Sequence, residues 1–291
     1  MINKVKAMFV PRKLVEERLK QLLADDIGQG DVTAAAVIPA GLTVLAAVIA
    51  KEPGVAAGIE EAKILAESMG LKVKTDVNDG ERIKYKQVLM QITGDAQTIL
   101  TVERTLLNLL SRMCGIATAT NRLTEKMRKA KSHAKIAATR KSAPGLLYFD
   151  KKAVLLGSGD PHRLHLDDMI LIKDNHLAIV GDPVEAVKIA KEKASFTKKI
   201  EVEITKVTDI TRVAEAGADI IMLDNFTPDE VDKAFELLKT VKLPHKVLIE
   251  ISGGINSETI TDYALAKADI ISVGEITHSV KSLDISLEII K

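Results

Sequence analysis

The chain has 291 residues, of which 46% are hydrophobic and 3% aromatic, with 41 Lys and Arg residues against 40 Asp and Glu residues. The composition is typical of a globular protein, and the length predicts one large domain or two unequal domains. A formal net charge of +1 provides no bulk field to hold a polyanion. We therefore expect neither nucleic acid nor an anionic membrane surface as a partner.

The cysteine count and the lack of a long apolar segment predict a cytoplasmic protein. Cys114 is the one cysteine, so the chain forms no internal disulfide, whereas secreted proteins more often carry paired cysteines. The N-terminus has no sustained apolar stretch before Pro11 and does not look like a signal peptide. The longest apolar stretch, residues 42–50, is far shorter than the roughly 20 residues that cross a bilayer.

The first third of the chain predicts a small sheet with helices on one side. Val15, Leu19 and Leu22 recur at helical spacing before a polar turn. The expected elements are this helix, the turn at residues 25–31, strands at 43–50 and 88–93, and a helix at 59–68.

A long helix is expected over residues 98–113. Its buried apolar stripe is predicted at Val102, Leu106, Leu109 and Met113. Arg104 lies about 200° around the helix from Val102, because each residue advances the helix by about 100°. Arg104 therefore points away from the stripe and is available to another surface.

From residue 135 onward, short apolar runs alternate with helical segments. The runs cover residues 135–139, 169–172, 199–204, 219–223, 246–251 and 269–273, and the clearest helices cover 183–193, 207–216 and 229–238. Apolar strands separated by helices predict a parallel sheet covered by helices. The expected fold class is α/β, with an incomplete (β/α) barrel as the natural closure of six such strands. A doubly wound sheet is the alternative, but no glycine-rich fingerprint follows the first strand.

Polar residues or glycines follow nearly every run, at the strand ends where such barrels build their active sites. These residues are Thr139, Arg140, Lys141, Lys173, Asp174, Asn175, His176, Asp224, Asn225, Ser252, Gly253, Gly254, Gly274 and Glu275, with Glu201 and Glu203 inside the third run. A charged residue at one strand end is usually a cap or a loop ion pair. Its repetition at successive strands favours a site.

The basic members of this set predict an anion. Arg140, Lys141, His162, Arg163 and Lys173 would repel one another in a cleft, at about 4 kcal/mol for two charges 4 Å apart. Arginine forks suit carboxylates and phosphates, and lysine adds a point charge. A site built from these groups therefore needs an anionic ligand to fill it.

The glycines and acids complete the expected ligand. The sequence Ser252-Gly253-Gly254 can present backbone N–H groups to a phosphate, although such a turn alone is a weak signal. Glu203 and Asp224 can hold Mg²⁺ or accept hydrogen bonds from sugar hydroxyls. The ligand so described has carboxylate, phosphate and polyol parts and a divalent cation, as does a phosphoribosyl donor with an acidic acceptor.

Two other chemistries are weaker. His162, His165 and His176 suggest zinc, but no cysteine completes the set and the adjacent arginine would repel a cation. Lys141 or Lys173 could form a Schiff base, yet both are surrounded by expected anion ligands rather than by an apolar pocket. We expect no chemistry from Cys114, a small core residue of its helix.

Several motifs in order and spacing resemble the quinolinate phosphoribosyltransferase family. They are GDVTA, GVAAGIEEA, ERTLLNLLSRMCGIATAT, ATRKSAPGL, HRLHLDDMILIKDNH, EVEI, GADIIMLDN, ISGGI and ISVGEITHSVKSLDISL, which cover nearly the whole chain. The resemblance implies an N-terminal open-faced α/β sandwich domain over residues 1–112, to which residues 275–291 return, and an incomplete barrel over residues 113–274.

The same resemblance implies the reaction. Quinolinate and phosphoribosyl pyrophosphate would give nicotinate mononucleotide, pyrophosphate and CO₂ in NAD biosynthesis, with Mg²⁺ and no organic cofactor. A homodimer or a larger even oligomer is implied, in which Arg104 enters the site of the neighbouring subunit.

The implied site divides by ligand. Arg140, His162, Arg163 and Lys173 would bind the quinolinate carboxylates, and Lys141 would face the donor or the substrate. Glu203 and Asp224 would address the ribose and the metal, directly or through water, and with Lys141 form the implied catalytic set. The remaining implied substrate-binding residues are Thr139, Ser252, Gly253, Gly254, Val273, Gly274 and Glu275.

Several residues that would border the acceptor pocket depart from the family pattern. They are Leu147, Ser158, Asp160, Pro161 and His165. The open alternatives are a ModD-like pyrophosphorylase with a different acidic acceptor, a Schiff-base lyase on the same barrel, and a phosphate-binding barrel without catalysis.

Overall fold

The computed structural model describes residues 10–290 of the chain, so most of the N-terminal segment considered above as a signal peptide lies outside the described residues. The chain divides into two compact units, each described here by itself. Within the described residues, unit 1 comprises residues 10–121, Tyr148–Ser158 and 280–290, and unit 2 comprises Arg122–Leu147 and Gly159–Ser279. No helix of residues 10–290 has both the length and the apolar character needed to cross a membrane.

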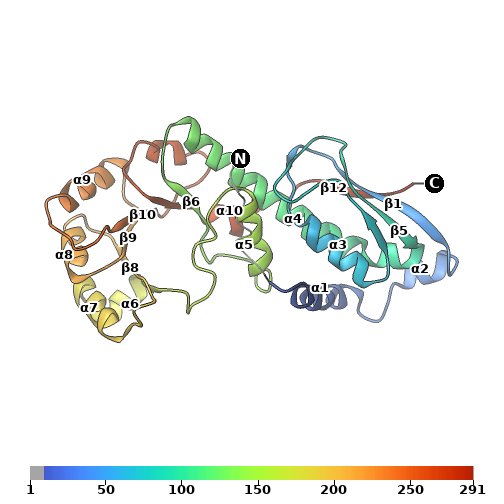
Figure 1. The fold of residues 1–291 in the computed structure, drawn as a ribbon, viewed down its shortest axis with the longest axis horizontal. Coiled ribbons are helices and arrows are strands. Elements are labelled where there is room, and N and C mark those ends of the chain that lie inside the picture. The colour runs from blue at the N-terminus through green and yellow to red at the C-terminus, as the bar shows by residue number, and fades with distance from the viewer. Residues whose placement is uncertain (1–9, 291) are drawn as a thin grey trace. The chain divides into compact units, whose positions relative to one another are not determined.

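Unit 1 is built on an antiparallel four-stranded sheet in the order β12-β1-β5-β3 (Figure 1). Its strands are β1 (Thr43–Ala50), β3 (Lys72–Lys74), β5 (Val88–Asp95) and β12 (Ile285–Ile290), with a separate short pair of β2 (Gly54–Val55) and β4 (Arg82–Ile83). Its helices are α1 (Arg12–Ile27), α2 (Val32–Val37), α3 (Ile59–Ser68), most of α4 (Ala96–Lys129) and nearly all of α5 (Leu147–Leu156). The strands expected at 43–50 and 88–93 and the helix expected at 59–68 are thus confirmed.

Apolar spacing accounts for the packing of the unit 1 helices. In α1 the buried residues are Val15, Leu19 and Leu23, so the predicted stripe holds except that Leu23 replaces Leu22. The predicted stripe of α4 is confirmed, since Val102, Leu106, Leu109 and Met113 are all buried. The buried position predicted for Cys114 is also confirmed, and burial raises the pKa of its thiol to about 12.

The end predicted for α4 is wrong, because the helix continues to Lys129. No proline interrupts residues 114–129, and the one glycine there, Gly115, is tolerated for a packing reason. A Cβ at Gly115 would lie 2.3 Å from the carbonyl oxygen of Lys281, so the missing side chain lets the C-terminal segment pass directly over the helix.

Unit 1 also contains a buried ionic network. The ammonium group of Lys152 on α5 lies 2.7 Å from Glu61 Oε1, 2.8 Å from Glu60 Oε2 and 3.4 Å from Asp79 Oδ2. The Glu61 side chain is 1% exposed and that of Lys152 is 10% exposed. The network joins α5 to α3, because Lys152 lies on α5 and both glutamates lie on α3. Separating the two helices would leave a buried charge without its partner, which is strongly unfavourable.

Unit 2 contains the predicted parallel sheet of six strands, in the order β6-β11-β10-β9-β8-β7. The strands are β6 (Lys135–Ala137), β7 (Ile170–Ile172), β8 (Ile200–Ile204), β9 (Ile220–Asp224), β10 (Leu248–Ser252) and β11 (Ile270–Ser272). β6 and β7 form the two edges and are not paired with each other, so the barrel is incomplete, as expected. A single parallel bridge between Ala137 and Asp160 lies beside β6.

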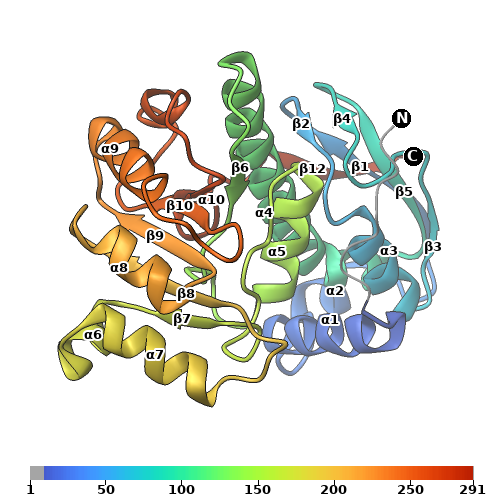
Figure 2. The same ribbon diagram turned by 60° about the vertical axis from the view of Figure 1, so that its left-hand side comes forward.

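Helices cover the outer side of this curved sheet (Figure 2). They are α6 (Asp174–Val180), α7 (Pro183–Lys193), α8 (Asp209–Ala216) and α9 (Pro228–Leu238). A 3₁₀ turn (Ile260–Tyr263) and the short α10 (Glu275–His278) follow later in the chain. All of β8 is buried, because its alternate residues face α7 and α8 on one side and the sheet interior on the other. Glu201 and Glu203 share the interior side.

Candidate active site

A cavity of about 450 Å³ opens in unit 2 at the carboxyl ends of β6, β10 and β11. Seven residues predicted for the site line this cavity: Thr139, Lys141, Ser252, Gly253, Gly254, Gly274 and Glu275. Its other lining residues include Asn256, Ser257, Ser272, His278 and Ser279, which the sequence analysis missed. Most of these groups are polar, so the cavity suits a hydrophilic ligand.

The turn after β10 is shaped by positive φ angles. Gly253 has φ +90° and Gly254 has φ +61°, which glycine adopts without strain. Asn225, with φ +59°, donates its backbone N–H to the Ser252 carbonyl over 2.9 Å and its Nδ2 to Asp224 Oδ2 over 2.7 Å. One asparagine therefore ties the acid at the end of β9 to the glycine turn at the end of β10.

Lys141 and His278 border the same cavity close to Gly274. A Cβ placed on Gly274 would lie 3.1 Å from His278 Cδ2 and 3.4 Å from Lys141 Cδ. Glu275 Oε2 accepts the Ser257 N–H over 3.1 Å and so holds the next loop in place. A lysine and an imidazole beside exposed main chain form a setting that binds phosphate well.

The two predicted acids lie on neighbouring strands, as the sequence implied. Glu203 pairs with Met222 across β8 and β9, and Asp224 is two residues further along the same face. Glu203 Oε2 accepts a charged hydrogen bond from Lys173 Nζ over 2.9 Å. These hard carboxylate oxygens match the donor set that Mg²⁺ prefers.

Arg163 and Arg140, which lies just after β6, repel each other electrostatically. Burial lowers the pKa of the Arg163 guanidinium, and the positive charge of Arg140 lowers it further, against the opposite effects of Glu201 and Asp168. Among the described residues, the buried Nε of Arg163 has no hydrogen-bond partner. Two like charges with an unsatisfied donor form an incomplete arrangement that an anion would complete.

The loop carrying Arg163 is pinned by an acid and by unusual backbone angles. Asp168 Oδ2 accepts the backbone N–H groups of Leu164 at 2.6 Å and His165 at 2.9 Å. Ser158 has φ +70° and His162 has φ +52°, the region that glycine favours. Ser158 therefore adopts a backbone angle that glycine would take with less strain.

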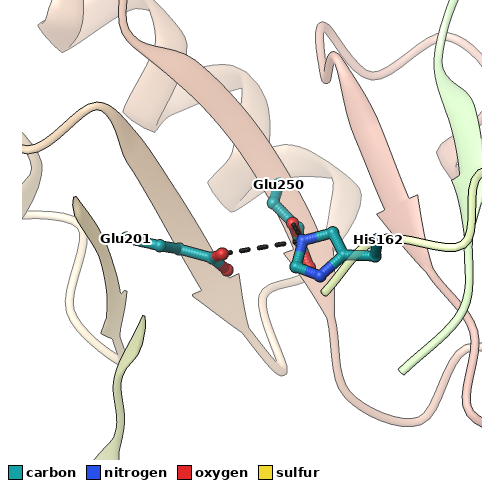
Figure 3. Close-up of side chains that lie close together, drawn as sticks. All are labelled: His162, Glu201 and Glu250. Atoms are coloured by element: carbon teal, nitrogen blue, oxygen red, sulfur yellow. Dashed lines mark hydrogen bonds and ion pairs between the residues drawn. The ribbon is translucent and has the colours of Figure 1, made fainter. Parts of the chain in front are cut away.

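His162 reaches the interior of the sheet, where two glutamates surround its ring (Figure 3). Its Nε2 lies 3.0 Å from Glu250 Oε2 and 3.6 Å from Glu201 Oε2. Both glutamate side chains are 0% exposed. Burial, and second the charge of Glu250, raise the pKa of Glu201 to about 8, although His162, Lys173 and Arg163 oppose the shift.

The sequence analysis missed Glu250 as a site residue. It lies in the middle of an apolar run and is followed by another apolar residue, so nothing after the strand marks it. The available signal was a charge in a run otherwise buried on both faces, as at Glu201.

Three predicted residues have other surroundings. The Val273 N–H donates to the Ala137 carbonyl over 2.9 Å, so this amide belongs to the β6–β11 ladder. Arg104 lies in unit 1 with 65% of its side chain exposed, and its guanidinium lies 3.9 Å from Glu103 Oε1. Arg140 is exposed at the end of β6, where it acts on Arg163.

The histidines considered for zinc do not come together. Nδ1 of His176 accepts the Lys173 N–H over 2.9 Å at the start of α6. Among the described residues, the groups of acids and histidines close enough to share an ion each contain at most one histidine: His162 lies with Glu201 and Glu250, and His165 with Asp167 and Asp168. The zinc set of three histidines is therefore absent from residues 10–290.

Known proteins match this chain over most of its length. Residues 31–114 match the family "quinolinate phosphoribosyl transferase, N-terminal domain", and residues 116–288 match "quinolinate phosphoribosyl transferase, C-terminal domain". A probable nicotinate-nucleotide pyrophosphorylase (carboxylating) of Methanocaldococcus jannaschii is 46% identical, over 94% of this chain and 96% of that protein. A nicotinate-nucleotide pyrophosphorylase (carboxylating) of Mycobacterium leprae is 37% identical, again over 94% of this chain and 96% of that protein.

A solved structure agrees with these sequence matches. The nicotinate-nucleotide pyrophosphorylase of Francisella tularensis superimposes with a TM-score of 0.88 and 33% identity, over 97% of this chain and 98% of that one. The agreement extends across both units, and both parts of the family match in chain order. This chain is a member of the quinolinate phosphoribosyl transferase family.

Proposed function

We propose that this chain transfers the phosphoribosyl group of phosphoribosyl pyrophosphate to quinolinate, with release of pyrophosphate and CO₂ and formation of nicotinate mononucleotide. The observation that carries the proposal is the pair Arg140 and Arg163: among residues 10–290 the buried Nε of Arg163 has no hydrogen-bond partner, and burial and then the charge of Arg140 lower the pKa of its guanidinium. A ligand with two adjacent carboxylates supplies the charge that this pair lacks. Membership of the family supports the same acceptor.

On the donor side, the cavity fits a 5′-phosphate. The main chain at Gly253 and Gly254 can approach the phosphate closely, and Lys141 with His278 neutralises part of its charge. Glu203 and Asp224 are then the acids for the ribose hydroxyls, because they follow one another on the interior face of β8 and β9. The residues named here for binding the phosphoribosyl donor and for binding the quinolinate acceptor thus all belong to unit 2.

The reaction runs in two stages on the bound pair. In the first stage the quinolinate nitrogen forms a bond to ribose C1 while the bond from C1 to pyrophosphate breaks, and the leaving oxygen takes the electron pair. In the second stage CO₂ leaves from C2 of the cationic ring, the electron pair remains at C2, and a proton then binds there. The protein mainly orients the reactants and stabilises charge.

Glu203 and Asp224 would hold Mg²⁺, directly or through water, since their oxygens are of the hard type this ion binds. When bound, the ion would neutralise charge on the pyrophosphate. Because the positive charge of the ribosylated ring nitrogen stabilises the electron pair left at C2 when CO₂ departs, we propose no organic cofactor.

We also propose that the enzyme is a cytoplasmic homodimer or a larger even oligomer. Arg104 is exposed on α4 and pairs only weakly with Glu103, so it is available to a neighbouring subunit. A cation supplied across the subunit interface would complete the neighbour's anion site.

The decisive test is a product assay with quinolinate, nicotinate or no acceptor, each with phosphoribosyl pyrophosphate and Mg²⁺. We expect nicotinate mononucleotide and CO₂ only in the reaction that contains quinolinate as the acceptor. Arg140→Ala should lower kcat/KM for quinolinate by about a hundredfold or more, because a charge-assisted contact is lost without any change in the core. Arg212→Ala, which removes an exposed arginine paired with Asp182 and Asp209, is the matched control and should change little. Near-normal turnover in Arg140→Ala would contradict the assignment.

A further inference from the structure

The ring of His162 is held from inside the sheet by residues of three different segments. Its backbone N–H donates to Asp160 Oδ1 over 2.8 Å, which fixes the left-handed turn at His162. Its Nε2 faces Glu250 on β10 and Glu201 on β8 (Figure 3). The ring is thus placed by the strands of the sheet as well as by its own loop.

The hydrogen bonds of Glu250 indicate which atoms carry hydrogen. Ser272 Oγ on β11 lies 2.6 Å from Glu250 Oε1, and His162 Nε2 lies 3.0 Å from Glu250 Oε2. A carboxylate that is ionised only accepts, so both neighbours are satisfied when Ser272 and His162 donate to it. This pattern places a hydrogen on Nε2 of His162.

The charges around the ring favour its cationic form. Glu250 and Glu201 face Nε2 from two strands, Asp160 lies in the same loop, and Arg163 is the next residue along the chain. His162, Lys173 and Arg163 lower the pKa of Glu201, whereas burial and the charge of Glu250 raise it. An acid at hydrogen-bond distance in a buried setting stabilises the imidazolium.

We propose that Glu250 is a positioning residue, which accepts the Nε2–H of His162 and so fixes the imidazole ring, and favours its cation, for a carboxylate of the acceptor. The inference rests on the proposed function, in which the loop of His162 and Arg163 binds quinolinate. Ser272 supports the same arrangement by holding the other oxygen of Glu250. Glu250 itself remains behind the imidazole and touches no substrate.

The test compares Glu250→Gln with the unmodified enzyme. Glutamine keeps the volume and one accepting oxygen but removes the charge, so the ring keeps a partner and loses its counter-ion. We expect the KM for quinolinate to rise about tenfold, with the KM for phosphoribosyl pyrophosphate and kcat changed by less than about threefold. The loss of kcat/KM for quinolinate at high pH should begin about one pH unit lower, because the imidazolium is less stable. Ser272→Ala, which keeps the charge, should shift both quantities in the same direction by less.

A second measurement needs no activity. Nitrogen NMR of histidine-labelled protein, with His162 assigned by His162→Gln, should show that the imidazole of His162 titrates at lower pH in Glu250→Gln than in the unmodified protein. Glu61→Gln is the matched control, because Glu61 is also a fully buried glutamate but belongs to unit 1, whereas Glu250 belongs to unit 2. This substitution should change neither the His162 titration nor the quinolinate KM.

The outcomes separate the two proposals. If the unmodified enzyme makes no nicotinate mononucleotide, the proposed function fails, while the NMR titration still tests the pairing of Glu250 with His162. If the enzyme is active but Glu250→Gln leaves the quinolinate KM, the pH profile and the His162 titration unchanged, the positioning role is refuted. A stoichiometric metal in the purified enzyme that is lost in Glu250→Gln would also overturn it, since Glu250 would then be a ligand.

Discussion

Substituting Gly253 tests whether contact with Asn225 shapes the cavity. A Cβ at Gly253 would lie 2.4 Å from Asn225 Oδ1 and 2.8 Å from the Asn225 backbone nitrogen, so either the turn or Asn225 must move. The left-handed φ costs about 1 kcal/mol for alanine, and the overlap adds about 1–3 kcal/mol. Gly253→Ala should therefore lower the free energy of unfolding by about 2–4 kcal/mol.

Gly254→Ala is the matched comparison for stability. Gly254 also has a left-handed φ, of +61°, but a Cβ there would meet nothing within 4 Å. Its cost should be about 1 kcal/mol, from the backbone angle alone. Urea unfolding of both variants measures the difference, and equal losses of stability would refute the contact argument.

The kinetic consequence of Gly253→Ala follows from what Asn225 holds. Moving Asn225 disturbs its bonds to Ser252 and Asp224, so the phosphate and ribose groups lose their alignment. One lost hydrogen bond to a charged group costs about 1.5–3 kcal/mol, which corresponds to an increase of about tenfold or more in the KM for phosphoribosyl pyrophosphate. Steady-state kinetics with varied phosphoribosyl pyrophosphate would measure this increase in KM. If Gly253→Ala is less stable but its KM for phosphoribosyl pyrophosphate is unchanged, the turn does not contribute to phosphate binding.

Three further predictions concern the oligomer, the core and the thiol. Mixing inactive Arg104→Ala with inactive Arg140→Ala should restore part of the activity through hybrid dimers, and no recovery after demonstrated subunit exchange would contradict a shared site. Lys152→Met should lower the free energy of unfolding by about 3–5 kcal/mol in urea, because it leaves the carboxylate of Glu61 buried without its cation, and a stability within 1 kcal/mol of the original would contradict this. Cys114 should not react with a thiol reagent at pH 8 until the protein unfolds, because burial raises the pKa of its thiol to about 12. In the unfolded chain the thiol ionises at its ordinary pKa of about 8.5, so ionisation favours the unfolded state and stability should fall as the pH rises above about 8.5. Rapid labelling of the native protein would refute that account.

The strands of unit 2 could be predicted because their signal is local. Runs such as residues 219–223 are apolar throughout and are bounded by polar turns, which is typical of strands buried on both faces. The rule that such barrels use the carboxyl ends of their strands then led to Lys141, Gly253 and Gly274, which line the observed cavity. Position relative to a strand was sufficient for these residues.

Other features depend on contacts that no local pattern contains. Asn225 matters because a side chain at Gly253 would collide with it, and the two residues follow different strands. His278 was missed for a different reason: it is only four residues from Gly274, but the helix that carries it has four residues and is too short for periodicity to reveal. Glu250 was missed because the alternation of a buried strand does not indicate which of its faces meets other acids.

The distribution of charge in unit 2 explains why its cations are ordered before a ligand arrives. Glu201, Glu203 and Glu250 are buried on the strands, whereas Lys173 follows a strand end and His162 lies in a loop. Each of these two side chains reaches back to one or two of the strand carboxylates, at 2.9–3.6 Å. A carboxylate substrate therefore meets cations already oriented from behind, so binding requires less ordering of side chains. Neutralising a strand glutamate should then weaken binding of the acceptor even though the glutamate never contacts it.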